Sequence, residues 1–287
     1  MATPRVSSRR RSITGPRVGG WGLNLLLLAL GLLMFVPFYW MLVNAFLPRA
    51  EAFSLPPLWF PTNLTVANHR EVFEIIPFGR LILNSLKLTA IITVGSVATS
   101  TLAAYAFARL RFPGRDILFI VFLSALMVPQ QVTVIPTFVL MRNLGLLDTH
   151  EAIYLPALIN VFGTFLLRQF FLTIPRDLED AAKIDGAGHL RILANVIIPL
   201  SGPALSALAI FTALAAWNDF FWPNIFLSSP EKMTLPVGLV LLSGRFGGGS
   251  PVVILAALSM IVVPILVLFV FAQRRITESI AMTGLRG

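Results

Sequence analysis

The chain has no cysteine among its 287 residues. Disulfides, thiolate metal sites and a cysteine nucleophile are therefore excluded. Charge is also scarce, because Asp, Glu, Lys and Arg make up only 12% of the residues, whereas 56% are apolar. A soluble domain of this length has too little interior to bury so much apolar surface. The composition therefore indicates a protein whose solvent is the lipid bilayer.

Motifs for nucleotide binding and catalysis are missing as well. There is no Gly-x-x-x-x-Gly-Lys-Ser/Thr segment, so ATP binding through a P-loop is excluded. Neither His-Glu-x-x-His nor a nucleophile elbow occurs, and the histidines are scattered at His69, His150 and His189. We therefore expect no catalytic residue, no metal site and no cofactor bound by this chain.

The excess of Lys and Arg is interpreted as a sign of how the chain is oriented in the membrane. The net charge of +9 would suggest a nucleic-acid partner in a soluble protein. In a membrane protein, however, Lys and Arg concentrate on the cytoplasmic side. No nucleic-acid partner is therefore expected.

Windows of about 20 residues with almost no charge match the ~30 Å of hydrocarbon in a bilayer. They predict an all-α, polytopic fold with six transmembrane helices in one transmembrane domain, residues 21–273, between basic tails at 1–20 and 274–287. The expected spans cover approximately residues 21–44, 86–108, 117–141, 152–173, 200–222 and 251–273.

The connections give an expected orientation. With both termini in the cytoplasm, most of the Lys and Arg residues fall on the inside, as topology rules require. The long connections 46–83 and 223–250 then lie outside. Each is large enough to touch an external partner, although a plain connector explains either one equally well.

The connection between the fourth and fifth spans carries helix signals of its own. Asp177, Glu179 and Asp180 follow Pro175, and acids favour the first turn of a helix. Gly186 permits the left-handed turn that ends such a helix. Glu179 and Lys183 are spaced to pair along it.

Two faces of this connection are also predicted. The first helix would present Leu178, Ala181, Ala182 and Asp185, a shallow face open to close approach. A second amphipathic segment would run to Pro199 with one face formed by Leu190, Leu193, Ala194 and Ile197. This pattern alone fits a hairpin lying on the membrane interface as well as a docking element.

The spacing of the same segment resembles the EAA loop of ABC importer permeases. That pattern is Glu-Ala-Ala, three residues, Gly, nine residues, then Ile-x-Leu-Pro. The chain reads Asp180-Ala181-Ala182, then Gly186, then Val196-Ile197-Ile198-Pro199. Asp replaces Glu, and Val and Ile replace Ile and Leu. The run Asp185-Gly186-Ala187 is similar to the carbohydrate-importer version.

The resemblance extends over nearly the whole chain. Its length, without a large outside insertion, matches the shorter permease subunit of the maltose-transporter type. Further matching stretches are residues 103–109 with Pro113-Gly114, Met127-Val128-Pro129 through Pro136, Trp217-Asn218-Asp219-Phe220 and the ending Gly284-Leu285-Arg286-Gly287.

The resemblance implies a type I ABC importer transmembrane domain in a bacterial inner membrane. This chain would form half of a carbohydrate pathway with a second, longer permease subunit. Two cytoplasmic ATPase subunits would carry ATP and Mg²⁺, so the chain itself would not be an enzyme. An extracytoplasmic sugar-binding protein would deliver the substrate. The coupling loop, residues 174–199, would dock on an ATPase through Glu179, Asp180, Ala181, Ala182, Lys183, Asp185 and Gly186.

Candidate substrate contacts are fewer. Gln130 and Gln131 lie in the third expected span beside Pro129, and Asn218 and Asp219 lie near the outer end of the fifth. Polar groups at membrane depth usually face the bundle interior. Helix–helix hydrogen bonds explain the glutamines equally well, and an interfacial aromatic belt explains the surroundings of the second pair.

The same residues leave two other functions open. One is an importer permease for a non-sugar solute, which would share the loop in looser form. Another is a stand-alone secondary transporter, which favours paired repeats and ionisable residues at the bilayer midplane. Neither feature is evident here. The sequence does not name the sugar.

Overall fold

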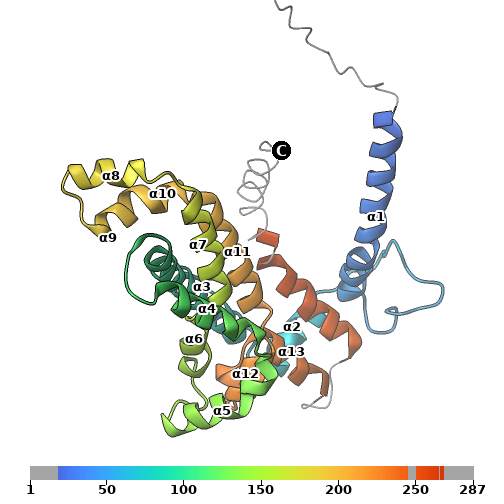
Figure 1. Cartoon of the computed structure of the whole chain (residues 1–287). Coiled ribbons are helices and arrows are strands. Elements are labelled where there is room, and N and C mark those ends of the chain that lie inside the picture. Colours follow the sequence, from blue (N-terminus) through green and yellow to red (C-terminus); the bar gives the residue numbers. More distant parts are fainter. Residues whose placement is uncertain (1–18, 245–249, 265, 268–287) are drawn as a thin grey trace, which may run out of the picture.

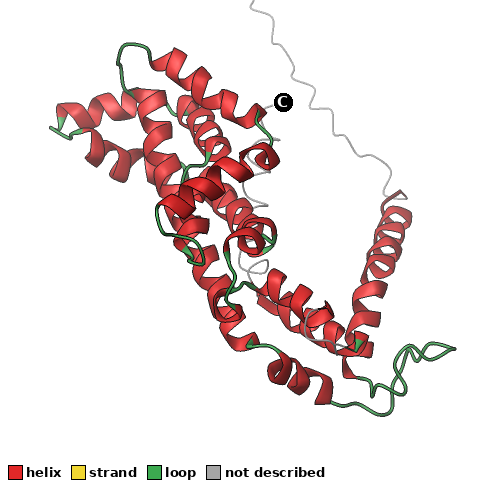
Figure 2. Cartoon of the chain, turned by 90° about the horizontal axis from the view of Figure 1, so that it is seen from below, coloured by secondary structure: helices red, strands yellow, loops and turns green. Residues whose placement is uncertain are grey.

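The computed structural model describes residues 19–244, 250–264 and 266–267. Within these ranges every regular element is a helix, as Figure 2 shows, so the all-α prediction is confirmed. The basic tails, apart from Gly19 and Gly20, lie outside the described residues. So do the end of the sixth expected span and the final stretch 284–287.

The first helix, α1 (Gly19–Phe46), stands apart from the rest of the molecule (Figures 1 and 2). It is apolar, and most of its side chains from Trp21 to Phe38 are exposed. A short amphipathic helix, α2 (Ala67–Ile75), is fastened to its end, because the buried Asn68 amide donates to the Ala45 and Leu47 carbonyls. Surface of this kind suits lipid or another membrane chain.

The long helix α3 (Phe78–Arg109) forms the centre of the body and packs against α7 (Val161–Thr173) and α11 (Gly202–Trp217). Small residues let these helices approach closely, as in other membrane bundles. A Cβ on Gly163 of α7 would lie 2.8 Å from Ser100 Oγ on α3 and 2.9 Å from Leu208 Cδ1 on α11. A larger residue at position 163 would therefore make the Ser100 and Leu208 side chains shift where the three helices meet.

The third expected span is not one helix. It is divided into α4 (Arg115–Ser124) with a 3-10 turn (Ala125–Met127), and α5 (Gln130–Asn143), and the two parts meet at 101°. Pro129 stands at the break. Proline has no N–H for the helix ladder and disfavours helical geometry in the residue before it. Val128 is accordingly extended, with ψ 115°.

The next two expected spans are also interrupted. The fourth consists of α6 (Glu151–Ala157) and α7, which begins after Asn160, whose side chain accepts a hydrogen bond from the Gly163 N–H at 2.7 Å. In the fifth, α11 ends at Trp217, before the expected end at residue 222, and the helical stretch His189–Leu200, which belongs to the preceding loop, meets the start of α11 at 82°. The chain then continues through α12 (Phe221–Phe226), a 3-10 turn (Pro230–Lys232) and α13 (Leu235–Gly244).

Three helical stretches of the described chain are long and apolar enough to cross a membrane: Trp21–Phe46, Phe78–Arg109 and Glu151–Thr173. Each of the two bent pairs adds one more if it crosses as a unit. The apolar helix Pro251–Pro264 lies where the sixth span is expected, and the remainder of that span falls largely outside the described residues.

Candidate functional site

The predicted coupling loop, residues 174–199, folds into a helical hairpin that projects from one end of the body (Figure 1). Its first arm is α8 (Asp177–Ile184), and its second is α9 (His189–Ile192) followed by a π-helical turn (Leu193–Ile197) and α10 (Ile198–Leu200). Gly186 joins the arms with φ +78°, the left-handed geometry that the sequence predicts. The Gly186 and Ala187 N–H groups donate to the Lys183 and Ala182 carbonyls, which closes the end of α8.

The predicted pair between Glu179 and Lys183 is wrong. Lys183 Nζ contacts Asp180 Oδ1 at 2.8 Å, whereas Glu179 Oε1 lies 2.7 Å from Arg109 Nε at the end of α3. The side chains of Arg109 and Glu179 are only 3% and 7% exposed. Local spacing indicated the wrong partner because a buried site on another helix competes with it.

Arg109 links three segments. Besides its ion pair with Glu179, its Nη2 donates to the Phe171 carbonyl at 2.5 Å and to the Ile174 carbonyl at 2.7 Å, both at the end of α7. One guanidinium thus ties α8 to the cytoplasm-facing ends expected for α3 and α7. Its multiple donors in a fixed plane suit this task. The sequence placed Arg109 in a matching stretch but gave no signal that it meets Glu179.

The outward surface of the hairpin agrees only in part with the two predicted faces. Ala182 is half-buried and, with Ala187, packs on a core cluster that includes the buried Leu193 and Ile197. Large apolar side chains are exposed at Leu178 (45%) and Leu190 (74%), which belong to the predicted faces, and at Ile184 (87%), which does not. They lie among the exposed Asp180, Ala181, Lys183, Asp185 and Gly186. An exposed apolar patch rimmed by charge is typical of a docking surface.

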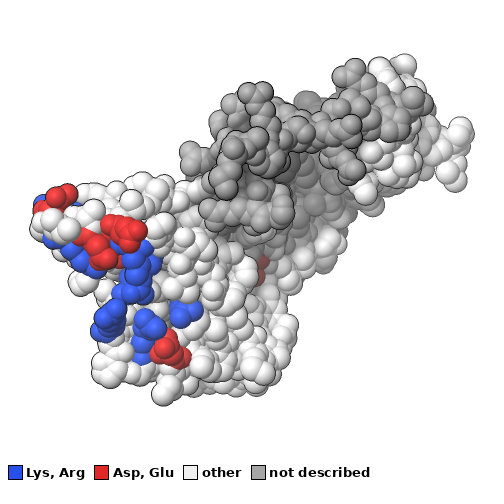
Figure 3. Space-filling view, turned by 45° about the horizontal axis from the view of Figure 1, so that its top comes forward, with Lys and Arg blue, Asp and Glu red and all other residues white. Residues whose placement is uncertain are grey.

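On one face of the molecule, charged side chains gather around the hairpin. Figure 3 shows Lys, Arg, Asp and Glu gathered at the end that carries the hairpin, while most of the described body in that view is uncharged. Within α8, the Lys183 ammonium donates a hydrogen bond to Asp180 and lowers the pKa of that carboxyl. The hairpin end is therefore the part of this face best suited to water and a polar partner.

A second candidate site is a partly open cavity of about 690 Å³ in the body. It is bordered by the broken elements α5, α6, α7, α11 and α12. Polar groups on its wall are Gln130, Thr133, Thr137, Asn160, Thr212 and Asp219, with aromatic rings from Phe162, Phe211, Trp222 and Phe226. Hydroxyl and amide groups beside aromatic faces can bind a hydroxylated solute by hydrogen bonding and stacking.

Two of the four candidate pathway residues line the cavity. Gln130 and Asp219 line it, and Gln131 and Asn218 do not. Asp219 Oδ1 accepts hydrogen bonds from the Phe221 and Trp222 N–H groups, and the Asn218 amide donates to the Leu214 carbonyl. Sequence reasoning missed the wall residues Asn160, Thr133, Thr137 and Thr212. Their only signal was a polar side chain in an apolar helix.

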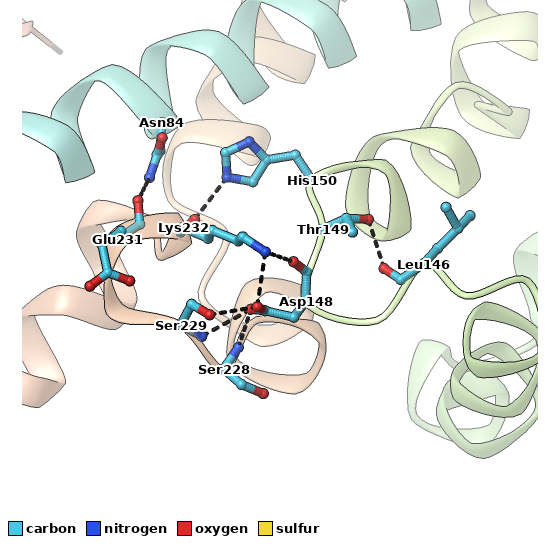
Figure 4. Close-up of polar contacts among 9 residues, drawn as sticks. All are labelled: Asn84, Leu146, Asp148, Thr149, His150, Ser228, Ser229, Glu231 and Lys232. Carbon is cyan, nitrogen blue, oxygen red and sulfur yellow. Dashed lines mark hydrogen bonds and ion pairs between the residues drawn. The ribbon is translucent and has the colours of Figure 1, made fainter.

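A polar cluster fastens the far end of the body (Figure 4). Asp148, between α5 and α6, accepts hydrogen bonds from the Ser228 and Ser229 N–H groups and from Ser229 Oγ, and pairs with Lys232 Nζ at 3.0 Å. His150 Nε2 contacts the Lys232 carbonyl at 2.8 Å. The Asn84 amide of α3 donates to the Glu231 and Met233 carbonyls. The cluster joins three parts of the chain.

We expect Asp148→Asn to lower thermal stability at pH 7 by about 2 kcal/mol, the order expected for hydrogen bonds to a charged group. Burial alone would raise the pKa of Asp148, but bonds from Ser229, Ser228 and Lys232 hold it well below its ordinary value. The contribution is present above the unfolded pKa and is lost as pH falls toward the folded one.

The difference in melting temperature between wild type and Asp148→Asn should therefore stay nearly constant from pH 7 to about pH 4 and shrink only as the pH falls further, as measured by thermal unfolding in detergent. The matched control is Glu231→Gln, since the Glu231 carboxylate points away from Asp148 in Figure 4. An equal loss in both variants, or a difference that does not depend on pH, would contradict the role given to Asp148.

Comparison with known proteins places the chain among transport components. The family model described as "Binding-protein-dependent transport system inner membrane component" matches residues 96–280. The arabinooligosaccharides transport system permease protein of Halalkalibacterium halodurans is 34% identical over 86% of this chain and 89% of its own length. The sulfoquinovosyl glycerol transport system permease protein of Agrobacterium fabrum is 35% identical over 88% of each.

A solved structure agrees with these sequences. A chain in the crystal structure of a bacterial ABC transporter involved in the import of the acidic polysaccharide alginate is 25% identical. It superposes with a TM-score of 0.81 over 95% of this chain and 99% of that one. The matched region 96–280 contains both the hairpin and the cavity-forming elements α5 to α12.

Proposed function

This chain belongs to the family of binding-protein-dependent transport system inner membrane components, and we propose that it is the permease subunit of an ABC importer for a sugar or sugar derivative. It forms half of the translocation pathway beside a second, longer permease subunit. The observation that carries this proposal is the pairing, in one chain, of an exposed docking hairpin with a polar and aromatic cavity in an apolar body.

In this proposal the chain crosses the bacterial inner membrane six times, with both termini in the cytoplasm. The hairpin is then cytoplasmic and docks on one of two ABC ATPase subunits, which hold ATP and Mg²⁺. Leu178, Ile184 and Leu190 form the apolar centre of that contact, and Asp180, Lys183 and Asp185 form its charged rim. The chain supplies no catalytic residue and binds no cofactor.

The docked hairpin would transmit ATPase closure to the pathway. Glu179 is buried, so it positions the hairpin and does not touch the ATPase. Arg109 carries the displacement of α8 to the ends of α3 and α7. The cavity borders α7 and α11, which pack on α3, so the same displacement reaches the substrate site. ATP binding at the ATPase and substrate binding at the cavity would thereby each shift the equilibrium between two conformations of the pathway.

The wall of the cavity favours a carbohydrate over an anionic solute. Asp219 is the charged residue among the described lining residues, and Lys and Arg are absent from that set. A phosphate or carboxylate normally requires a cation or a cluster of N–H donors. Hydroxyl groups of a sugar match the amides, threonine hydroxyls and rings found here. An external sugar-binding protein would deliver this substrate.

The test is uptake by the whole complex, with its partner permease, ATPases and binding protein, in proteoliposomes. Candidate carbohydrates are screened for ATP-dependent accumulation, and the positive sugar is then measured in two adjacent variants. Gln130→Ala should reduce uptake about fivefold, the effect of about one lost hydrogen bond. Gln131→Ala should leave it near wild type, because Gln131 does not line the cavity. Accumulation without ATP, or equal effects of the two variants, would contradict the proposal.

A further inference from the structure

The connection between α1 and α2 exposes an unusual amount of apolar surface. Residues 52–66 contain no Asp, Glu, Lys or Arg. Leu55 is 91% exposed and Phe60 is 86% exposed, and Leu58, Trp59, Leu64 and Val66 are exposed beside them. Contiguous exposed apolar surface of this kind marks a contact with lipid or with another protein.

The segment is held against α1 by specific contacts. The Phe53 N–H donates to Asn44 Oδ1 at 3.2 Å, and the Phe53 ring meets Trp40 edge-on with centroids 5.4 Å apart. Tyr39 Oη donates to the Trp59 carbonyl at 2.6 Å. Since Tyr39 precedes the end of α1 by about 10 Å along the helix axis, the connection folds back beside the last turns of α1.

Those turns carry the lipid-suited surface of α1. Phe35 and Phe38 are 54% and 52% exposed, and Leu42 is 38% exposed. The exposed side chains of residues 52–66 therefore continue an apolar surface that already faces away from the body. Tyr39, Trp40 and Trp59 lie at this level, and Trp and Tyr are enriched where a membrane meets water.

We propose that residues 52–66 are an interfacial membrane anchor whose apolar side chains enter the boundary between headgroups and acyl chains. The segment lies away from the hairpin in Figures 1 and 2, so a cytoplasmic hairpin makes this the outer leaflet. An uncharged segment can enter that boundary without desolvating an ion. Asn63 already donates to Glu51 at 3.1 Å, which leaves the exposed surface dominated by apolar groups, as lipid requires.

The absence of cysteine makes the depth of this segment directly measurable. A nitroxide is attached to Phe60→Cys in the complete complex in lipid nanodiscs, and its collision rates with oxygen and with a neutral nickel chelate are recorded. Leu28→Cys, 61% exposed in α1, is the lipid reference. Glu231→Cys, exposed in the connection after α12, is the water reference.

The label at position 60 should collide with the nickel chelate at least threefold less often than the label at 231, while its oxygen collisions stay high. Nickel collisions equal to those at 231 would place the segment in water and overturn the anchor. Low rates with both reagents would place it against a protein partner and overturn it as well. The collision rates are measured without substrate or ATP. A result against the anchor therefore leaves the proposed transport function standing, and a negative uptake test leaves the anchor standing.

Discussion

Arg109→Ala is expected to abolish ATP-driven uptake. The substitution leaves the Glu179 carboxylate buried without its partner and removes the donor to the Phe171 and Ile174 carbonyls. Breaking a buried ion pair from one side typically costs about 3–5 kcal/mol, because the remaining charge is uncompensated. Uptake and ATP hydrolysis measured together in proteoliposomes give the result as transported sugar per ATP, which should fall at least tenfold.

Milder variants separate positioning from folding. Glu179→Gln keeps an oxygen that can accept from Arg109 and leaves both carbonyl contacts intact, so it should retain more uptake than Arg109→Ala. Arg109→Lys keeps the charge, but its compact ammonium lacks the forked donors that reach Glu179 and two carbonyls. Arg111→Gln, at an exposed arginine just beyond α3, is the matched control and should behave as wild type.

The readout of these variants is the ratio of uptake to hydrolysis. A purely structural role would lower the melting temperature, the hydrolysis and the uptake together. Positioning predicts assembled complexes that hydrolyse ATP yet accumulate little sugar. Wild-type uptake per ATP in Arg109→Ala would refute the link between α8 and α3.

Gly186→Pro is the second substitution expected to stop transport. Gly186 has φ +78°, and the proline ring holds φ near −65°. Proline also removes the N–H that donates to the Lys183 carbonyl at 2.9 Å. The turn between the hairpin arms must therefore reform, which displaces the exposed residues of α8 and α9. Sugar uptake should fall to background, measured beside ATP hydrolysis by the same complex.

Gly188 provides the matched control two residues away. Its φ of −76° and ψ of 168° are values that proline adopts, so Gly188→Pro should retain most of the uptake. Gly186→Ala should be intermediate, because a Cβ meets nothing within 4 Å and the penalty is limited to the left-handed backbone, about 1–2 kcal/mol. Normal sugar accumulation by Gly186→Pro would rule out a required left-handed turn.

Much of the fold was readable from the sequence. Low charge and high apolar content identified the bilayer as solvent, and the apolar windows located helices in the expected stretches. The end of α8 at Gly186 was also predictable, since only glycine adopts φ +78° without strain. These features depend on residues close together in the chain, which propensity and spacing describe well.

The geometry of the broken spans was not readable in the same way. The proline at position 129 accounts for a missing helix hydrogen bond, but not for a 101° turn. The turn lies where α4, which packs against α3 and α7, gives way to α5. It also places Gln130 on the cavity wall with Asp219 and leaves the neighbouring Gln131 off it.

The sequence by itself therefore determined that this is a membrane chain, that one connection between its helices is a hairpin of ABC importer type, and that this hairpin turns at Gly186. Only the tertiary structure decided that Glu179 is buried against Arg109 while Asp180 takes Lys183 at the surface. The physical reason is that an acid's partner is set by which distant segment shares its buried space. Local spacing would pair Glu179 with Lys183 at the solvent-exposed surface. The folded chain instead places the ends of α3 and α7, and with them Arg109, beside Glu179.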